Sequence, residues 1–219
     1  MPLLAEQADA GHAIYSKPVL QVYNVLVLGF FGRLIWRCPT GPLLNLYNRH
    51  VTGNHLDVGV GTGFFLDRCT WPMDRPRVGL MDLNPNCLAA AGRRIARFHP
   101  EIYRQNVLEP VRQDIRKFDS ISLSWLLHCL PGSIYSKAAV FENLKTLLNP
   151  GGVIFGGTLL HGGVHPHWLA RRLMSAYNER GIFTNMQDDL EGLKAVLQSS
   201  FSRSSVEVVG CGALFSGEV

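Results

Sequence analysis

The sequence predicts an α/β fold in which helices cover both faces of a mostly parallel sheet. Three observations favour this fold. Short apolar runs alternate with helical patterns from Asn54 onward, a glycine-rich turn follows the first run, and two closely spaced apolar runs come last. Such alternation is typical of parallel strands linked by crossover helices. The chain has 219 residues, of which 47% are hydrophobic, enough to bury one sizeable core.

The first fifty residues have a helical pattern. Ser16 and Pro18 indicate the start of a helix, which is followed by regularly spaced apolar residues. These residues are Val19, Val22, Tyr23, Leu26 and Val27. A second short helix is predicted from Pro42 to His50. We therefore expect two parts within one compact unit, an N-terminal helical segment over residues 1–50 and an α/β domain over residues 51–219.

Seven apolar runs are the candidate strands. They cover His55 to Val60, Val78 to Met81, Tyr103 to Val107, Phe118 to Leu123, Gly152 to Leu159, Ser205 to Val209, and Gly212 to Phe215. Only Gly210 and Cys211 separate the last two runs. So short a link predicts an antiparallel hairpin, which a parallel sheet would carry at one edge.

Two helices can be placed between these strands. Asn84 can cap a helix and Pro85 can occupy its first position, which predicts a helix from Pro85 to Phe98. Another helix precedes the final hairpin. Its apolar face consists of Leu190, Leu193, Val196, Leu197 and Phe201.

Composition argues against several classes of protein. Charged residues make up 17% of the chain, and the net charge of +4 comes from Lys and Arg that are scattered rather than clustered, which disfavours a nucleic-acid groove. The N-terminus lacks an export signal, and the apolar stretch from Val25 to Gly32 is far shorter than the roughly 20 residues of a membrane span. The five cysteines contain no C-x-x-C pair. We expect a cytoplasmic protein with reduced thiols, no membrane span and no nucleic-acid partner.

The glycine-rich turn is the main candidate for a ligand site. A strand that ends at Asp57 leads into Gly59, Gly61 and Gly63, so the backbone can approach a ligand closely and direct free N–H groups at it. An ordinary tight turn would not need three alternating glycines. Dinucleotide enzymes use a related turn with a further glycine at the position of Phe64, and a bulky ring there disfavours that geometry.

Asp82 is the second element of this site. It ends the next predicted strand, where a carboxylate can accept hydrogen bonds from both hydroxyls of a ribose. A purely structural role as a helix cap is less favoured, because Asn84 is better placed for that role.

Taken in order, these features resemble the class I methyltransferase superfamily that depends on S-adenosylmethionine (SAM). The resemblance covers Asn54 to Phe215 and includes Phe118 to His128 as the fourth strand with its exit, and Leu148 to Gly152 as the turn before the fifth. It implies a Rossmann-like fold with a mostly parallel seven-stranded sheet, a C-terminal antiparallel hairpin and an N-terminal helical lid. It implies SAM as cofactor and S-adenosylhomocysteine (SAH) as product.

The resemblance also implies which residues bind the cofactor. They are Asp57, Gly59, Val60, Gly61 and Gly63 at the glycine turn, Asp82 and Leu83 at the ribose, Asn106 and Val107 at the adenine, and Ser124 after the fourth strand. Asn106 departs from the Asp that is commoner in the family. Its side-chain oxygen can still accept a hydrogen bond from the adenine amino group.

The stretch from Tyr23 to Arg37 resembles the helical lid of small-molecule methyltransferases, which would exclude water from the reacting methyl group. Candidate contacts to the acceptor are Tyr15, Tyr23, Trp36, Trp125 and His161, with Phe30 and Phe31 as further apolar surface. Aromatic residues at helical spacing are also common in cores, and that alternative stays open.

Methyl transfer from a sulfonium requires mainly that the acceptor be positioned in line with the methyl group. If a general base is used, His128 is the first candidate, because it follows the fourth strand. A structural histidine that hydrogen-bonds backbone is the competing interpretation. His161, His165 and His167 have no supporting carboxylate or thiolate cluster, so no metal site is predicted.

The leading hypothesis is a SAM-dependent methyltransferase that acts on oxygen, nitrogen or carbon of a small, apolar or aromatic metabolite, for example in secondary metabolism. Ser124-Trp125-Leu126-Leu127 replaces the Asn/Asp-Pro-Pro-aromatic motif of many enzymes that methylate bases or protein amino groups. Two alternatives remain: a cyclase that uses the sulfonium charge without methyl transfer, and a non-catalytic regulatory subunit. A monomer or a homodimer is expected.

Overall fold

The computed structural model describes residues 32–219 except residue 113. Its helices are α3 (Thr40–His50), α4 (Phe64–Arg68), α5 (Pro85–Arg94), α6 (Ala138–Lys145), α7 (Trp168–Glu179) and α8 (Leu190–Ser200), with short 3-10 turns η2 (Ala96–Phe98) and η3 (Leu127–Cys129). Its strands are β1 (Asn54–Val58), β2 (Arg77–Asp82), β3 (Glu101–Arg104), β4 (Phe118–Ser124), β5 (Leu148–Leu159), β6 (Arg203–Val209) and β7 (Gly212–Glu218).

The strands form one sheet in the order β3-β2-β1-β4-β5-β7-β6. The first five strands are parallel, and β7 pairs antiparallel with both β5 and β6. The predicted seven-stranded, mostly parallel sheet with a C-terminal antiparallel hairpin is therefore confirmed. The strand order reverses between β1 and β4, and in such sheets ligands bind beyond the carboxyl ends of the strands at this point.

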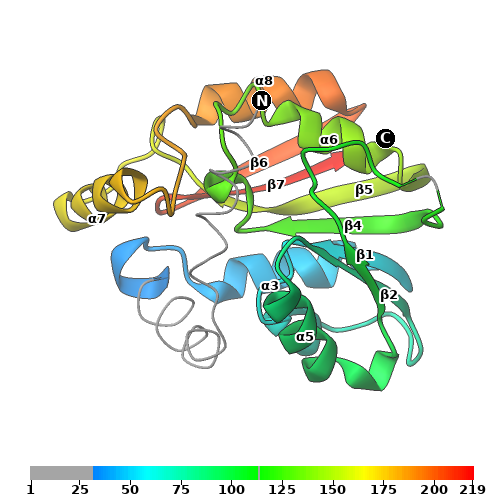
Figure 1. The fold of residues 1–219 in the computed structure, drawn as a ribbon. Helices are drawn as coiled ribbons and strands as arrows, with labels where there is room; N and C mark the ends of the chain where they lie inside the picture. Colours follow the sequence, from blue (N-terminus) through cyan, green and yellow to red (C-terminus); the bar gives the residue numbers. More distant parts are fainter. Residues whose placement is uncertain (1–31, 113) are drawn as a thin grey trace.

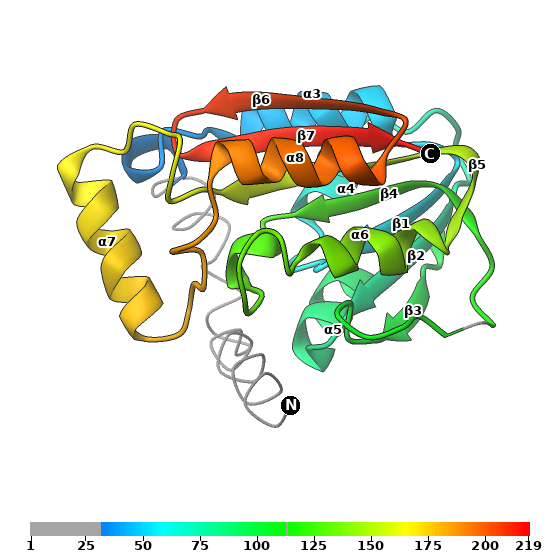
Figure 2. The same cartoon turned by 90° about the horizontal axis from the view of Figure 1, so that it is seen from above.

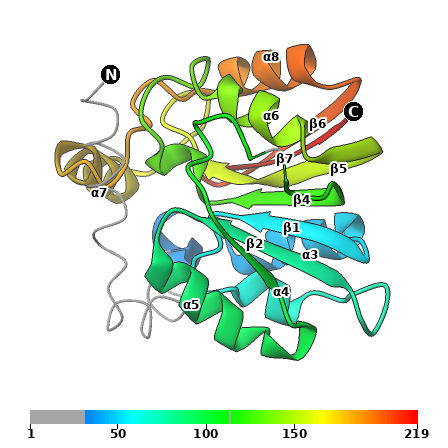
Figure 3. The same ribbon diagram turned by 45° about the vertical axis from the view of Figure 1, so that its right-hand side comes forward.

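Helices cover both faces of the sheet (Figure 1). In Figure 3, α6 and α8 lie over one face, while α3, α4 and α5 lie over the other. Seen from above, α7 projects beyond the end of the sheet instead of covering a face (Figure 2). Fully buried side chains such as Leu56, Ile121 and Phe155 fill the layers between sheet and helices. No helix within residues 32–219 is both long and apolar enough to cross a membrane.

The helix signals at Asn84 and Pro85 are confirmed. The Asn84 side chain accepts a hydrogen bond from the backbone N–H of Asn86, and Pro85 is the first residue of α5. The α-helix ends at Arg94, and η2 continues to Phe98, where the prediction had one helix throughout. Helix α3 begins at Thr40, two residues before the predicted start. The helix predicted after Pro18 lies outside the described residues.

The third strand lies earlier than predicted. It spans Glu101–Arg104, whereas the prediction was Tyr103 to Val107. The reason is that β3 is an edge strand with an exposed apolar residue, Ile102, while Val107 is buried from a loop position after the strand. The buried Val107 therefore extended the apolar pattern past the end of the strand, and the predicted strand was placed too late in the sequence.

A buried ion pair joins two loops at the carboxyl end of the sheet. Lys137 Nζ lies 2.5 Å from Asp188 Oδ2, and both side chains are fully buried. The same ammonium donates to the backbone oxygen of Thr184 at 3.1 Å. These contacts fix the segment before α6 against the segment between α7 and α8.

Candidate cofactor and acceptor site

The glycine turn between β1 and α4 has a backbone that few residues other than glycine adopt. Gly59, Gly61 and Gly63 have φ angles of 70°, 50° and 69°, in the left-handed region. The turn is held by two backbone hydrogen bonds, from Gly59 N–H to the oxygen of Met81 and from Gly63 N–H to the oxygen of Val60. Its conformation thus explains the alternation of glycines in the sequence.

The three glycines differ in what surrounds them. A Cβ atom on Gly59 would lie 3.0 Å from the Leu126 side chain, and one on Gly63 would lie 3.1 Å from Ala91 of α5. A Cβ on Gly61 would meet no heavy atom within 4 Å. Gly59 and Gly63 therefore allow close packing of the protein on itself, whereas Gly61 faces open space.

That open space is a cavity at the carboxyl ends of β1, β2 and β4. Residues from four successive parts of the chain line it. They are Val58, Gly59, Gly61, Thr62, Phe64 and Phe65, then Met81 to Asn84 with Cys87, then Gln105 to Val107, and finally Ser124 to Leu126 with Cys129 and Leu130. Most predicted cofactor residues are brought together here. Asp57, Val60 and Gly63 are not among the lining residues.

Asp82 lines the cavity at the end of β2. Its Oδ1 atom accepts a hydrogen bond from the backbone N–H of Asn84 at 2.8 Å, so the carboxylate is fixed by its own turn. Strand register places Met81 beside Val58, and Val58 beside Leu123. Asp82 and Ser124 therefore flank the glycine turn two strand spacings apart, roughly 10 Å. This separation suits a nucleoside at one end and an amino-acid arm at the other.

Asn106 lines the cavity beyond β3, but its side chain is engaged locally. Its Oδ1 accepts from the backbone N–H of Leu108 at 3.1 Å, and its Nδ2 donates to Glu109 at 3.1 Å. An amide oxygen has two lone pairs, so Oδ1 retains the capacity to accept a second hydrogen bond from an adenine. The turn that Asn106 forms also holds the neighbouring Val107 against the core.

Asp57 lies behind the glycine turn in a buried polar network. Its Oδ1 accepts a hydrogen bond from the hydroxyl of Tyr47 at 3.0 Å and another from the hydroxyl of Ser122. The ring of His55 continues the network, because its two nitrogens contact Ser120 and Ser122. Burial raises the pKa of Asp57 to about 6 and lowers the pKa of His55 to about 3.

Trp125 forms the opposite wall of the cavity from Asp82. Trp125 is one of three non-glycine residues in the described part of the chain with a positive φ, 58°, and its backbone N–H donates to the oxygen of Gly157 at 2.7 Å. Its ring lies beside Gly157 and Gly212, and a Cβ on Gly212 would approach the indole to 3.3 Å. The indole Nε1 is buried and has no hydrogen-bond partner within the described part of the chain. Strained residues with unsatisfied groups are concentrated at functional sites.

His128 is buried and does not line the cavity. Its Nδ1 accepts from the backbone N–H of Leu159 at 3.4 Å, and its ring packs edge-on against Phe183 at 4.6 Å. Burial, with the positive charge of Lys137 as a smaller cause, lowers the pKa of His128 to about 3. This geometry favours the competing interpretation from the sequence, a structural histidine that hydrogen-bonds backbone.

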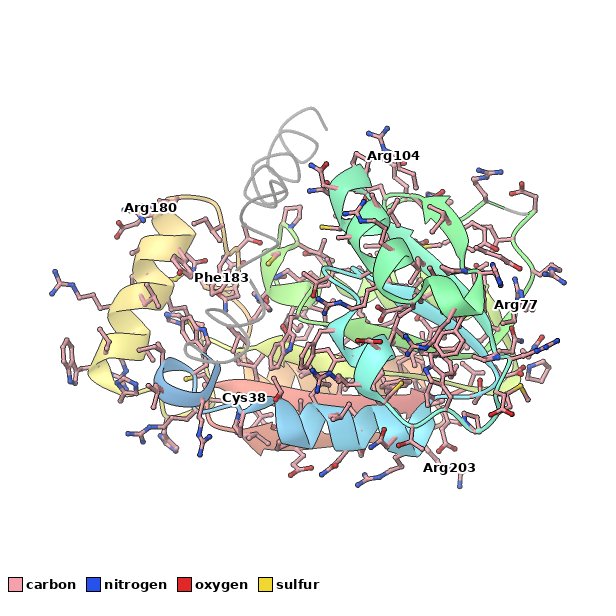
Figure 4. The ribbon with its side chains drawn as sticks, turned by 90° about the horizontal axis from the view of Figure 1, so that it is seen from below. Cys38, Arg77, Arg104, Arg180, Phe183 and Arg203 are labelled. Atoms are coloured by element: carbon pink, nitrogen blue, oxygen red, sulfur yellow. The ribbon has the colours of Figure 1, made fainter. Side chains whose placement is uncertain are left out.

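The other predicted acceptor contacts are dispersed. Trp36 is buried in a separate aromatic group, with its ring 5.9 Å from Phe183. Figure 4 labels Phe183 beside α7, at the opposite end of the sheet from Arg77. His161 is exposed and lines a second small cavity with Arg171. The remaining predicted contacts, Tyr15, Tyr23, Phe30 and Phe31, lie outside the described residues.

No group of three or more His, Cys, Asp or Glu side chains that could hold a metal ion occurs among residues 32–219 without residue 113. His167 instead caps α7, with its Nδ1 accepting from the backbone N–H of Leu169 at 3.2 Å. The cysteines in this part of the chain carry free thiols.

Sequence reasoning missed several residues of the site. Tyr47 was not singled out, because only the fold brings it beside Asp57, ten residues away. Leu126, Cys129 and Leu130 complete the apolar end of the cavity. Their position directly after the fourth strand was the available signal, since acceptor pockets in this fold open there.

The residues present fit SAM. Gly61 leaves room for a ligand beside the backbone, Asp82 offers a carboxylate that can accept from ribose hydroxyls, and Ser124 offers a hydroxyl that suits the amino-acid arm. The apolar lining around Val107 suits a purine ring. Each part of the cofactor therefore has a chemically matched part of the cavity wall.

Comparison with known proteins agrees with this geometry. The methyltransferase domain family matches residues 56–154. The chain is 37% identical over 209 residues to the demethylluteothin O-methyltransferase of Streptomyces thioluteus, covering 95% of this chain and 91% of that protein. It is 38% identical over 218 residues to the physcion biosynthesis cluster O-methyltransferase of Aspergillus chevalieri, covering 98% and 97%.

Among solved structures, the DhpI–SAH complex matches 97% of this chain and 96% of that chain with a TM-score of 0.69 and 17% identity. The N-methyltransferase NodS of Bradyrhizobium japonicum in complex with SAH matches 80% of this chain and 81% of its own with a TM-score of 0.55 and 16% identity. At these identities the structures show the shared fold.

Proposed function

The chain belongs to the class I SAM-dependent methyltransferases, and we propose that it methylates an oxygen atom of a small, ring-bearing and largely apolar secondary metabolite. SAM is its cofactor and SAH the product. Two relatives that match almost the whole chain are named demethylluteothin O-methyltransferase and physcion biosynthesis cluster O-methyltransferase. The observation that carries the proposal is the apolar end of the cavity, where Trp125, Leu126 and Leu130 surround the space beyond the glycine turn.

In this proposal the residues of the chain act by positioning. The bound cofactor supplies an activated methyl group on a sulfonium. Asp82 holds the ribose, the glycine turn accommodates the amino-acid arm, and Asn106 with Val107 flanks the adenine. Trp125 and Leu126 hold the acceptor in line with the methyl group. Holding two reactants in line supplies a large part of the rate acceleration in a displacement of this kind.

The described lining residues at the acceptor end provide orientation rather than proton removal, so the hydroxyl proton of the acceptor would pass to water. Cys129 is the titratable side chain there, and burial raises the pKa of its thiol to about 12. His128 stands behind this wall with its Nδ1 turned to backbone. We therefore assign His128 a structural role in this proposal.

The N-terminal lid remains part of the proposal. Helix α3, which belongs to the predicted 1–50 segment, packs against β5 and α4. We infer that α3 is integral to the α/β body and that residues preceding Thr40 provide the cover over the acceptor. We also propose a small-molecule acceptor in preference to nucleic acid, and a monomeric or homodimeric enzyme.

A single assay separates O-methylation from its alternatives. Purified protein is incubated with methyl-labelled SAM and demethylluteothin, alongside a panel of phenols and enols of similar size. The matched controls are the corresponding methyl ethers, in which the oxygen is already blocked. We expect label in a new methyl ether, equimolar SAH, and no turnover of the blocked compounds.

Other outcomes contradict the proposal in distinct ways. Conversion of an acceptor without SAH would indicate a cyclase, which the comparisons do not support. Label on a nitrogen or carbon atom of the product would agree with a methyltransferase but would contradict the proposal that oxygen is the methylated atom. Failure to bind SAH by calorimetry would indicate a non-catalytic subunit.

A further inference from the structure

Tyr47 connects three parts of the cofactor site, although it does not line the cavity itself. Its hydroxyl lies 3.0 Å from Asp57 Oδ1 and 3.2 Å from Ser124 Oγ. Its ring stacks on Phe65 with centroids 5.2 Å apart and an interplanar angle of 12°. Phe65 and Ser124 both line the cavity, and the Tyr47 side chain is almost fully buried.

The chemistry of these groups sets the direction of their hydrogen bonds. A phenol has a single proton, and an ionised carboxylate can only accept. Burial and the nearby carboxylate of Asp57 raise the pKa of Tyr47 well above its usual value, so the phenol keeps its proton. The charged carboxylate is a stronger acceptor than a hydroxyl, so we assign that proton to Asp57, which is also the nearer of the two oxygens. The Ser124 hydroxyl can then share the remaining contact only by donating its own proton to the phenol oxygen.

A consequence follows for the cavity. Once the proton of Ser124 points to Tyr47, the serine oxygen presents lone pairs, and no donor, to the ligand. Strand register puts Ser124 beside the glycine turn, since Val58 pairs with Leu123. In the cofactor placement of the proposed function, the amino-acid arm reaches this point, and the α-ammonium of that arm is its only cationic hydrogen-bond donor.

We propose that Tyr47 is a positioning residue that orients the Ser124 hydroxyl to accept a hydrogen bond from the α-ammonium group of the cofactor. The three side chains form a hydrogen-bonded relay, in which Asp57 accepts from Tyr47 and Ser124 is the end that faces the ligand. The inference rests on the cofactor site of the proposed function. It adds a specific source of affinity for the amino-acid arm. This affinity comes from a residue of α3 that lies outside the cavity wall.

The test compares two ligands that differ in that arm. SAH carries the amino-acid arm, whereas 5′-methylthioadenosine has the same nucleoside and a neutral thioether without it. Both are titrated calorimetrically at pH 8 into the wild-type protein and Tyr47→Phe, which keeps the stacking ring. We expect the Kd of SAH to rise roughly 10-fold, as for loss of a charged hydrogen bond, and the Kd of methylthioadenosine to change less than twofold.

Two further variants sharpen the result. Tyr103→Phe is the matched control, because Tyr103 also donates to a carboxylate, Glu101, but lies away from the cavity; it should change neither Kd. Ser124→Ala should weaken the binding of SAH as Tyr47→Phe does. The double variant should bind SAH no more weakly than either single variant, because the effects of substitutions within one hydrogen-bond network are not additive.

Three outcomes would overturn the inference. If Tyr47→Phe weakens both ligands equally, its role is general support of the cavity. If the losses in the double variant add, Tyr47 and Ser124 act independently. If Tyr47→Phe binds SAH as the wild type does, there is no relay. A wild-type protein that binds neither ligand would overturn the cofactor site itself, a distinct result.

Discussion

The backbone N–H of Asn84 donates a hydrogen bond to Oδ1 of Asp82 at 2.8 Å, while the Asn84 side chain caps α5. One short turn thus fixes both the cavity carboxylate and the start of the following helix. Asp82→Asn keeps an oxygen for Asn84 and removes the negative charge. We expect SAH to bind roughly 10- to 100-fold more weakly, because the ribose loses a charged acceptor. Calorimetry measures this, and Asp119→Asn, an exposed carboxylate at the other end of β4, is the control.

The different surroundings of Gly61 and Gly63 give a second prediction. Gly61→Ala meets no protein atom, so it should lower the free energy of unfolding only by the cost of the left-handed backbone, about 1–2 kcal/mol. Its methyl group enters the cavity and should weaken SAH at least tenfold. Gly63→Ala has the same backbone cost and in addition approaches Ala91, so its loss of stability should be larger. Urea unfolding and calorimetry test both, and equal stability of the two variants would contradict the argument.

Trp125 leads to a prediction about the acceptor. Its indole N–H has no partner among the described residues and would donate a hydrogen bond to an oxygen of the methyl acceptor, because a buried donor without a partner is costly. Trp125→Phe keeps an aromatic ring and removes this donor. We expect kcat/KM for an accepted compound to fall roughly 10-fold while the Kd of SAH changes less than twofold. Equal losses in both quantities would instead assign Trp125 to the cofactor.

For His128 we expect little effect on chemistry. A general base contributes roughly 10²- to 10⁴-fold to the rate, so His128→Asn should reduce kcat less than threefold if the role is structural. A hundredfold loss with a shifted pH–rate profile would restore the catalytic interpretation.

The same variant has a defined effect on acid stability. The folded-state pKa of about 3 is lower than the ordinary value of 6.5, so between these values the unfolded chain binds a proton that the native protein does not. Stability therefore falls as the pH falls from about 6.5 toward 3. His128→Asn should reduce that slope by up to one proton, about 1.4 kcal/mol per pH unit. His55, with a similarly lowered pKa, contributes with the same sign and remains in the variant.

The buried pair of Lys137 and Asp188 gives a stability prediction. Asp188→Ala leaves an ammonium buried without its counter-ion, which typically costs about 3–5 kcal/mol of the free energy of unfolding. Replacing both residues, as Lys137→Met with Asp188→Leu, should recover most of that loss. Denaturant unfolding of the single and double variants provides the measurement. A double variant as unstable as Asp188→Ala would show that the charges themselves are required.

Local signals predicted much of this fold. The cap at Asn84, the glycine turn and the short link at Gly210 depend on neighbouring residues, and each is found where the sequence indicated. The misplaced β3 shows the limit of such reasoning, because burial in a loop and burial in an edge strand give the same apolar pattern.

The site was harder to predict in full because its side chains are coupled over long distances in sequence. The contact between Tyr47 and Ser124 joins residues 77 positions apart, and Lys137 reaches Asp188 across 51. His128 illustrates the reverse case. Its position after β4 indicated the cavity, but the direction of its ring depends on β5 and on Phe183, which a single sequence does not reveal.

The antiparallel insertion of β7 has a consequence for the order of synthesis. Strand β6 is made before β7 but contacts the sheet only through it, because β7 lies between β5 and β6. A nascent chain that has emerged only as far as Val209 therefore holds β6 without a partner and leaves one edge of β5 unpaired. Until Gly212–Glu218 leaves the ribosome, both edges are open to wrong pairing, and a chaperone that shields them would act during this interval.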